Sequence, residues 1–202
     1  MAGTNSNEIR VAGSGRVLIA NLGTAPPKDT TVDWAGWKDL GYTTTDGVKI
    51  SKKDKLDPID TWQSVSAARF VYSDRDLSFK FQLLQLNEDT LPFFFGGGSV
   101  TETATGSGVY RYDMAAEPKF DERMLGLEFS DGDQVKYRLI VSRGQVTETE
   151  EISLVRTAPV KLGVTFTALA TNDAAPLATF LMKDPNYSAT QVSSATQSSS
   201  AA

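Results

Sequence analysis

The acidic run Glu148, Glu150 and Glu151 is one place where this sequence could do chemistry, because a pair of carboxylates can hydrolyse a glycosidic bond. That reaction needs two carboxyl groups that face each other across a cleft and come from separate elements. Neighbours on one strand do not supply this geometry. We therefore interpret the run as the solvated face of a strand.

Two glycine-rich motifs could bind phosphate groups. Gly13-Ser14-Gly15 precedes the apolar segment RVLIANL, whereas a dinucleotide fingerprint places its glycines after a strand and at the start of a helix. Gly96-Gly97-Gly98 lacks the Lys-Ser/Thr pair of a phosphate-binding loop. We interpret the first motif as the entry to a strand and the second as a helix stop and hinge.

Three tryptophans, Trp34, Trp37 and Trp62, could form a platform on which sugar rings stack. They could equally be aromatic residues of the core or of a subunit interface. No calcium-like cluster of Asp and Asn accompanies them, so the core or interface interpretation is favoured.

The composition argues against catalysis. The 202 residues include no cysteine and no histidine, which excludes thiolate chemistry and removes the commonest general acid–base and metal ligand. With 20 basic and 25 acidic residues the net charge is −5, unlike the basic patch of a nucleic-acid reader. We expect no catalytic residue, no cofactor, no metal and no sequence-specific binding of nucleic acid.

The N-terminal segment MAGTNSNEIRVAG lacks the apolar core of a signal peptide. The longest apolar stretches, such as residues 92–98, are too short to span a bilayer. We therefore expect a protein that is soluble, makes no membrane contact and is synthesised in a cytoplasm.

Alternation of apolar and polar residues is the dominant pattern of the elements that must position these side chains. A period of two indicates half-buried strands. The residues that share an apolar face in three such segments are Leu77, Phe79, Phe81 and Leu83; Val135, Tyr137, Leu139 and Val141; and Leu162, Val164 and Phe166.

Turn signals separate these segments at Ser73-Asp74-Arg75, at Asp131-Gly132 and at Arg143-Gly144. They predict antiparallel hairpins from about residue 65 to 85 and from about 100 to 169. The predicted fold class is therefore all-β, with two antiparallel sheets packed as a sandwich or barrel.

The register of the hairpin predicted at Arg143-Gly144 depends on its turn. A two-residue turn would place Glu148 beside Leu139 on the apolar face, whereas a bulge moves the pairing by one residue and brings Arg138 opposite Glu150. Burial of an unpaired carboxylate costs several kcal/mol, so we favour the bulged register.

One short helix is predicted near residues 87–96. Asn87 can cap its N-terminus, Gly96 suits the position after its C-terminus, and Pro92 keeps it short. The rings of residues 93–95 would close one end of the core.

Two regions do not resemble strands. Residues 43–62 are polar and charged, and a loop of this length inside a domain is usually functional or disordered. Residues 188–202 consist almost wholly of Ser, Ala, Thr and Gln, a low-complexity tail that buries little apolar surface. We therefore predict one domain over residues 1–187, with an N-terminal arm and a long loop at 43–62, followed by the tail at 188–202.

The order of these features resembles the major tail proteins, or tail tube proteins, of phages with long non-contractile tails. The resemblance rests on DLGYTTTDGVKIS, the charged insert, ARFVYSDRDLSFKFQLLQLNEDTLPFFFGGG and SLVRTAPVKLGVTFTAL, and it runs from about Gly15 to Leu169. It lies in the order and spacing of the segments, since no single motif is diagnostic.

The resemblance implies a structural virion protein that forms six-membered rings. The rings stack into a tail tube through which genome DNA leaves without specific binding, and other tail proteins contact the tube at its tip and terminator ends. The long loop would contact the adjacent ring through Lys52, Lys53, Asp54, Lys55, Asp57, Asp60 and Trp62. Because an acidic lumen repels phosphate, Glu148 and Glu150 are the lumen candidates.

Three other readings stay open from the residues. A virion or cell-surface carbohydrate-binding sandwich predicts a monomer with exposed, coplanar tryptophans. An enzyme that uses carboxylates predicts two facing acidic groups in a pocket. The tube protein of a related contractile injection apparatus would share the fold.

Overall fold

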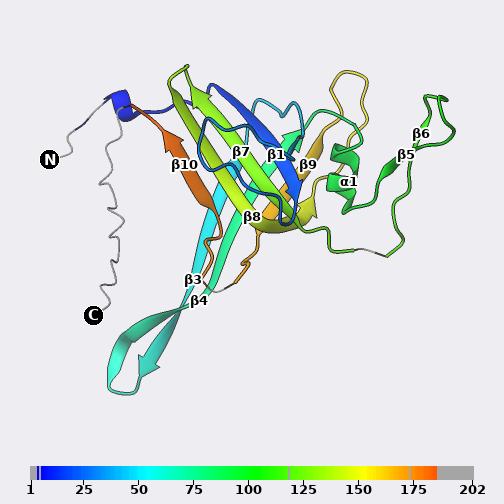
Figure 1. The fold of residues 1–202 in the computed structure, drawn as a ribbon. Helices are drawn as coiled ribbons and strands as arrows, with labels where there is room; N and C mark the ends of the chain where they lie inside the picture. Colours follow the sequence, from blue (N-terminus) through cyan, green and yellow to red (C-terminus); the bar gives the residue numbers. More distant parts are fainter. Residues whose placement is uncertain (1–3, 5, 118, 173, 186–202) are drawn as a thin grey trace, which may run out of the picture.

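The computed structural model describes residues 4, 6–117, 119–172 and 174–185, so the predicted tail at 188–202 lies outside the described residues. The chain folds mainly into antiparallel β-strands (Figure 1). The elements are η1 (Ser6–Glu8), β1 (Ser14–Asn21), β2 (Lys38–Asp39), β3 (Lys49–Thr61), β4 (Ser64–Leu83), α1 (Thr90–Phe95), β5 (Val100–Glu102), β6 (Tyr110–Tyr112), β7 (Arg123–Asp131), β8 (Val135–Thr149), β9 (Leu162–Ala168) and β10 (Thr179–Lys183).

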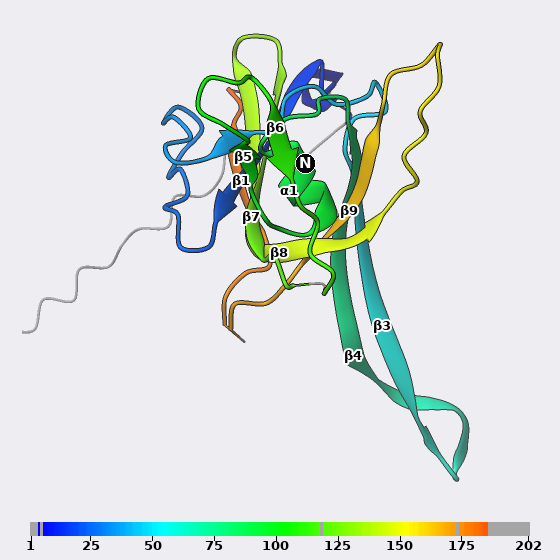
Figure 2. The ribbon, with the colours of Figure 1, turned by 90° about the vertical axis from the view of Figure 1, so that its right-hand side faces the viewer.

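One antiparallel sheet with the order β2-β1-β7-β8-β9-β4-β3 builds the domain, and β10 pairs with β8 outside this path. A small separate ribbon, β5-β6, lies beyond α1 (Figure 1). The sheet folds over so that β1, β7 and the first half of β8 face β4 and β9 (Figure 2). The all-β prediction is confirmed, and the two packed layers are two parts of one continuous sheet.

Strand β8 connects the two layers, because it belongs to both. Its first half pairs with β7, and from Gly144 onward it pairs with β9. The hairpin predicted at Arg143-Gly144 is therefore wrong, and so are both of its registers: Glu148 lies opposite Thr165 of β9. Gly144 serves close packing, since an added Cβ would lie 2.4 Å from the Phe166 ring and 2.5 Å from the Thr167 carbonyl oxygen.

The main core lies between the two layers. The apolar faces predicted for residues 77–83 and 162–166 point into it, and Phe79, Phe81 and Phe166 are fully buried. The predicted turn at Asp131-Gly132 is confirmed as the connection between β7 and β8.

Helix α1 closes one end of this core, as predicted. The Asn87 carboxamide oxygen accepts hydrogen bonds from the backbone N–H groups of Asp89 and Thr90 at 3.0 and 2.9 Å. Gly96 ends the helix with φ of 83°. Phe93 and Phe94 are buried, whereas Phe95 is partly exposed and stacks on Tyr112.

The outer face of the β1-β7-β8 layer is also covered. The segment of residues 22–37, which we call the cover segment, packs Trp34 and Trp37 against Leu18, Met124 and Ile140. Arg138, which alternates with the apolar residues of β8, is only 2% exposed beneath this segment. The alternation in β8 did not reveal this burial, because the covering residues come from a distant part of the chain.

Residues 43–62, predicted as a loop, are mostly strand. Strand β3 runs from Lys49 to Thr61 and pairs along its length with β4. The turn predicted at Ser73-Asp74-Arg75 is likewise wrong, because β4 is continuous there and the register shifts by one residue between Lys55 and Leu56. The turn-forming residues mark a β-bulge, which interrupts a ladder without ending it.

Candidate functional site

The β3-β4 hairpin projects far beyond the rest of the domain (Figures 1 and 2). Only its base, around Phe79, Phe81 and Leu83, packs into the core. Between Lys49 and Arg75 nearly every residue of both strands is exposed. An isolated two-stranded ribbon is at best marginally stable in water, so contact with another chain would stabilise this hairpin.

Charged residues near the middle of the hairpin satisfy one another. Asp54 accepts a hydrogen bond from Arg75 Nε at 2.9 Å and pairs with Lys52 Nζ at 2.5 Å. Hydrogen bonds from Arg75 and then Lys52 lower the pKa of Asp54. Lys55 lies 3.6 Å from Asp57. Four of the predicted contact residues are thus engaged within the hairpin itself.

The outer half of the hairpin carries an apolar face. Residues directly opposite each other in a ladder share a face, and Leu56 pairs with Tyr72 while Pro58 pairs with Phe70. Trp62 at the turn is 98% exposed. Exposed apolar surface of this extent marks an interaction site.

Sequence reasoning placed all the contact residues on one arm of this hairpin and missed Phe70 and Tyr72 on the returning strand. The signal that could have found them is the alternation Phe70, Tyr72 opposite Leu56, Pro58, which becomes visible only once the register of the two strands is known. The position of Trp62 at the tip, together with the burial of Trp34 and Trp37, removes the coplanar platform that a sugar-binding site would require.

The outward face of the β8-β9-β4 layer is a second candidate surface. In the described part of the chain no cover segment lies on it, and its side chains are mostly small and polar: Ser78, Lys80, Gln82, Thr147, Thr165 and Thr167. Glu150 pairs with Lys80 at 2.8 Å and accepts a hydrogen bond from Gln82 at 2.5 Å. These contacts, Lys80 first, lower the pKa of Glu150.

The predicted lumen residues differ in their surroundings. Glu148 is exposed near the end of β8, whereas Glu150 lies just beyond the strand and is only partly exposed beside Lys80. Both therefore lie by the open polar face, remote in the sheet from the hairpin tip at Trp62.

Several strands leave one edge free within the described chain. Among them, β3 pairs only with β4, β10 pairs only with β8, and β2 pairs only with β1. An unpaired edge presents a row of backbone donors and acceptors to another chain.

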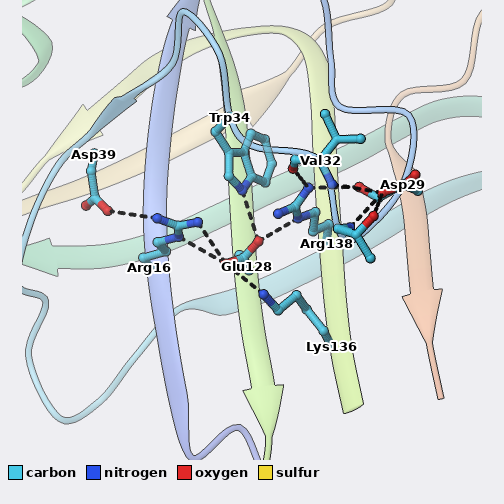
Figure 3. A network of polar contacts seen from close by, with 9 residues as sticks. Arg16, Asp29, Val32, Trp34, Asp39, Glu128, Lys136 and Arg138 are labelled. Atoms are coloured by element: carbon cyan, nitrogen blue, oxygen red, sulfur yellow. Dashed lines mark hydrogen bonds and ion pairs between the residues drawn. The ribbon is translucent and has the colours of Figure 1, made fainter. Parts of the chain in front are cut away.

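A buried polar network fixes the cover segment to the sheet (Figure 3). The Glu128 carboxylate accepts hydrogen bonds from Arg138 Nε at 2.5 Å and from Trp34 Nε1 at 3.0 Å, and Arg16 pairs with it at 2.9 Å. Arg138 also donates to the carbonyl oxygens of residues 29 and 32 at 2.8 and 2.6 Å. The network thus holds the cover segment through the Trp34 indole and through two backbone carbonyl groups.

The pKa of Glu128 should make stability depend on pH. Burial raises this pKa, but hydrogen bonds from Trp34 and Arg138 outweigh burial, so the pKa lies below its ordinary value of 4.5. The contribution of the carboxylate to stability is therefore complete above that value and is lost as the pH falls through the folded-state pKa. Urea unfolding at pH 7 and pH 3 should show a smaller loss of stability in Glu128→Gln than in the unaltered chain; an equal loss would contradict this assignment.

Sites for a metal or a membrane were also sought. Within the described residues no group of three or more His, Cys, Asp or Glu side chains is placed to hold a metal ion. Across the same residues no helix has the length and apolar character to span a bilayer.

Comparison with known families gives a match over most of the chain. The family model described as "Phage tail tube protein" matches residues 2–193, which is most of the chain. No curated protein matches the sequence.

Proposed function

Since the chain belongs to the phage tail tube protein family, a family of structural components of the virion tail, we propose that it forms rings of six subunits that stack into the tube through which DNA is ejected. The observation that carries the proposal is the projecting β3-β4 hairpin, which has an apolar outer face and no partner within the described chain. A subunit that assembles with copies of itself supplies that partner.

The hairpin is the proposed contact between successive rings. Of the residues implied by the resemblance, Trp62 and Asp60 lie at its tip, while Lys53 lies near its middle beside the paired charges of Lys52, Asp54, Lys55 and Asp57. We assign the contact mainly to the apolar face and the tip, because paired, exposed charges contribute little to association.

Free strand edges are the proposed contacts within a ring. The free edge of β3 borders the layer that contains β4, whereas β10 pairs with the first half of β8 in the other layer. A contact between two different surfaces of the same subunit is head-to-tail, and it closes into a ring when the rotation allows.

The open polar face of β8, β9 and β4 is the proposed lining of the lumen, with Glu148 and Glu150 at its margin. Its charges are few and partly paired, as in Lys80 with Glu150. Such a surface offers DNA phosphates no cluster of free cations, so DNA would pass without adhering. We further propose that the protein has no catalytic role and meets other tail proteins at the two ends of the tube.

Electron microscopy of the assembled protein, or of tails that contain it, tests this proposal. We expect stacked six-fold rings, hairpins that cross from ring to ring, and a channel lined by the face that carries Lys80 and Glu150. A strictly monomeric protein that binds glycans, or a channel lined by the cover segment, would contradict it.

A further inference from the structure

A groove of about 330 Å³ opens where the base of the β3-β4 hairpin approaches β1. Strands β1 and β3 do not pair with each other, so the folded sheet stays open here. The apolar lining comes from five strands and the segment before β3: Val17, Val48, Ile50, Phe129, Leu139 and Phe180.

Part of the groove lining lacks cover. Ile50 and Phe180 are each about half exposed although they are large and apolar. Three threonines, Thr43, Thr44 and Thr45, also line the groove. The hydroxyl oxygen of Thr44 is buried and has no hydrogen-bond partner among the described residues. The groove thus combines unpartnered apolar surface with nearby hydrogen-bond acceptors.

The same chain carries a side chain that suits this groove. Trp62 is almost completely exposed at the hairpin tip, and a tryptophan that becomes buried needs apolar surroundings and an acceptor for its indole N–H. Asp60 lies two residues before it, and Arg16 lines the groove with its side chain 44% exposed. The tip therefore carries an acidic side chain beside Trp62, and the groove carries a basic side chain that also pairs with Glu128.

Trp62 does not reach the groove of its own chain. Ile50 at the groove and Trp62 at the tip are joined by an extended strand, and at about 3.3 Å per residue this separates them by roughly 40 Å. We propose that the Trp62 tip of one copy docks into the Ile50–Phe180 groove of a second copy. A head-to-tail contact between the two ends of a subunit extends an assembly along one axis when its rotation does not close a ring.

This inference rests on the proposed tube and names the surface that receives the hairpin. It is tested by disulfide trapping, which is clean because the chain has no cysteine of its own. Gln63→Cys places a thiol beside Trp62, and Thr45→Cys places one at the exposed rim of the groove. The matched control pairs Gln63→Cys with Ser107→Cys, an exposed position near the β5-β6 ribbon.

Oxidised glutathione added to assembled protein should give a ladder of dimers, trimers and longer species with the 63–45 pair, and no ladder with the 63–107 pair. Mixing chains that carry one cysteine each should give only a 63–45 dimer. Circular dichroism checks that every variant is folded.

Electron microscopy of the same samples separates the two possible failures. Tubes that form without a 63–45 link, or with a 63–63 or 63–107 link, overturn the groove assignment and leave the proposed tube intact. Samples with neither tubes nor any link between chains overturn both.

Discussion

A chain in which residues 56–73 are replaced by Asn-Gly should fold as a monomer and fail to form tubes. Lys55 and Asp74 are directly paired, so a two-residue turn between them closes a shorter hairpin in the existing register. The removed residues are almost wholly exposed, and the core residues of β4 from Phe79 to Leu83 are retained. Circular dichroism and thermal unfolding should therefore change little, while electron microscopy should show that assembly is lost.

A matched pair of substitutions separates the length of the hairpin from its apolar face. Phe70→Thr with Tyr72→Thr removes two apolar side chains from that face, whereas Val71→Thr changes the opposite face. Threonine preserves strand propensity in both variants. We expect the double substitution to abolish tubes and Val71→Thr to permit them. Tubes of normal length in the shortened chain would show that the hairpin is not the contact between rings.

Arg138→Ala should be among the most destabilising single substitutions in the chain. Arg138 is buried, and its guanidinium contacts the Glu128 carboxylate, the Trp34 ring and two backbone carbonyls of the cover segment. Removing one partner of a buried ion pair costs about 3–5 kcal/mol. Here Glu128 Oε2 loses its charged partner, while Arg16 still pairs with Oε1. Urea unfolding at neutral pH measures this loss directly.

Lys136→Ala is the matched control, because Lys136 approaches the same carboxylate from the partly exposed side at 3.9 Å. Exposed ion pairs contribute about 0–1 kcal/mol, so we expect a small effect. Replacing both members of the buried pair, as in Glu128→Leu with Arg138→Met, should recover much of the stability lost in Arg138→Ala. Equal effects of Arg138→Ala and Lys136→Ala would mean that the network does not hold the cover segment.

The buried network around Glu128 and the projecting hairpin have separate roles. The network around Glu128 stabilises one layer of the sheet by fastening the cover segment onto it, whereas the hairpin from Lys49 to Leu83 extends the other layer into solvent. Substitutions in the network should therefore change the free energy of unfolding, whereas substitutions at the tip should change the formation of tubes. This separation allows loss of tubes to be distinguished from loss of folding.

Local patterns in the sequence determined the buried faces of several strands and the class of the fold. Alternation at Phe79 and Phe81, and at Val164 and Phe166, depends only on which face of a strand is buried, and the structure buries those faces. The Asp131-Gly132 turn and the helix that Gly96 ends also depend on neighbouring residues, and both were predicted. The exclusion of thiolate chemistry likewise followed from composition alone, since the chain has no cysteine.

Only the tertiary structure decided which strands pair, because a strand's neighbours come from distant parts of the chain. A glycine at position 144 is compatible with a turn or with a close contact. The structure shows that it allows close contact with the Phe166 ring of β9. The charged residues 49–61 favour a loop when read alone, and their ladder with β4 makes them a strand. The apolar side of the hairpin and the groove that we propose to receive it both consist of residues far apart in sequence, so neither existed as a local pattern to be read.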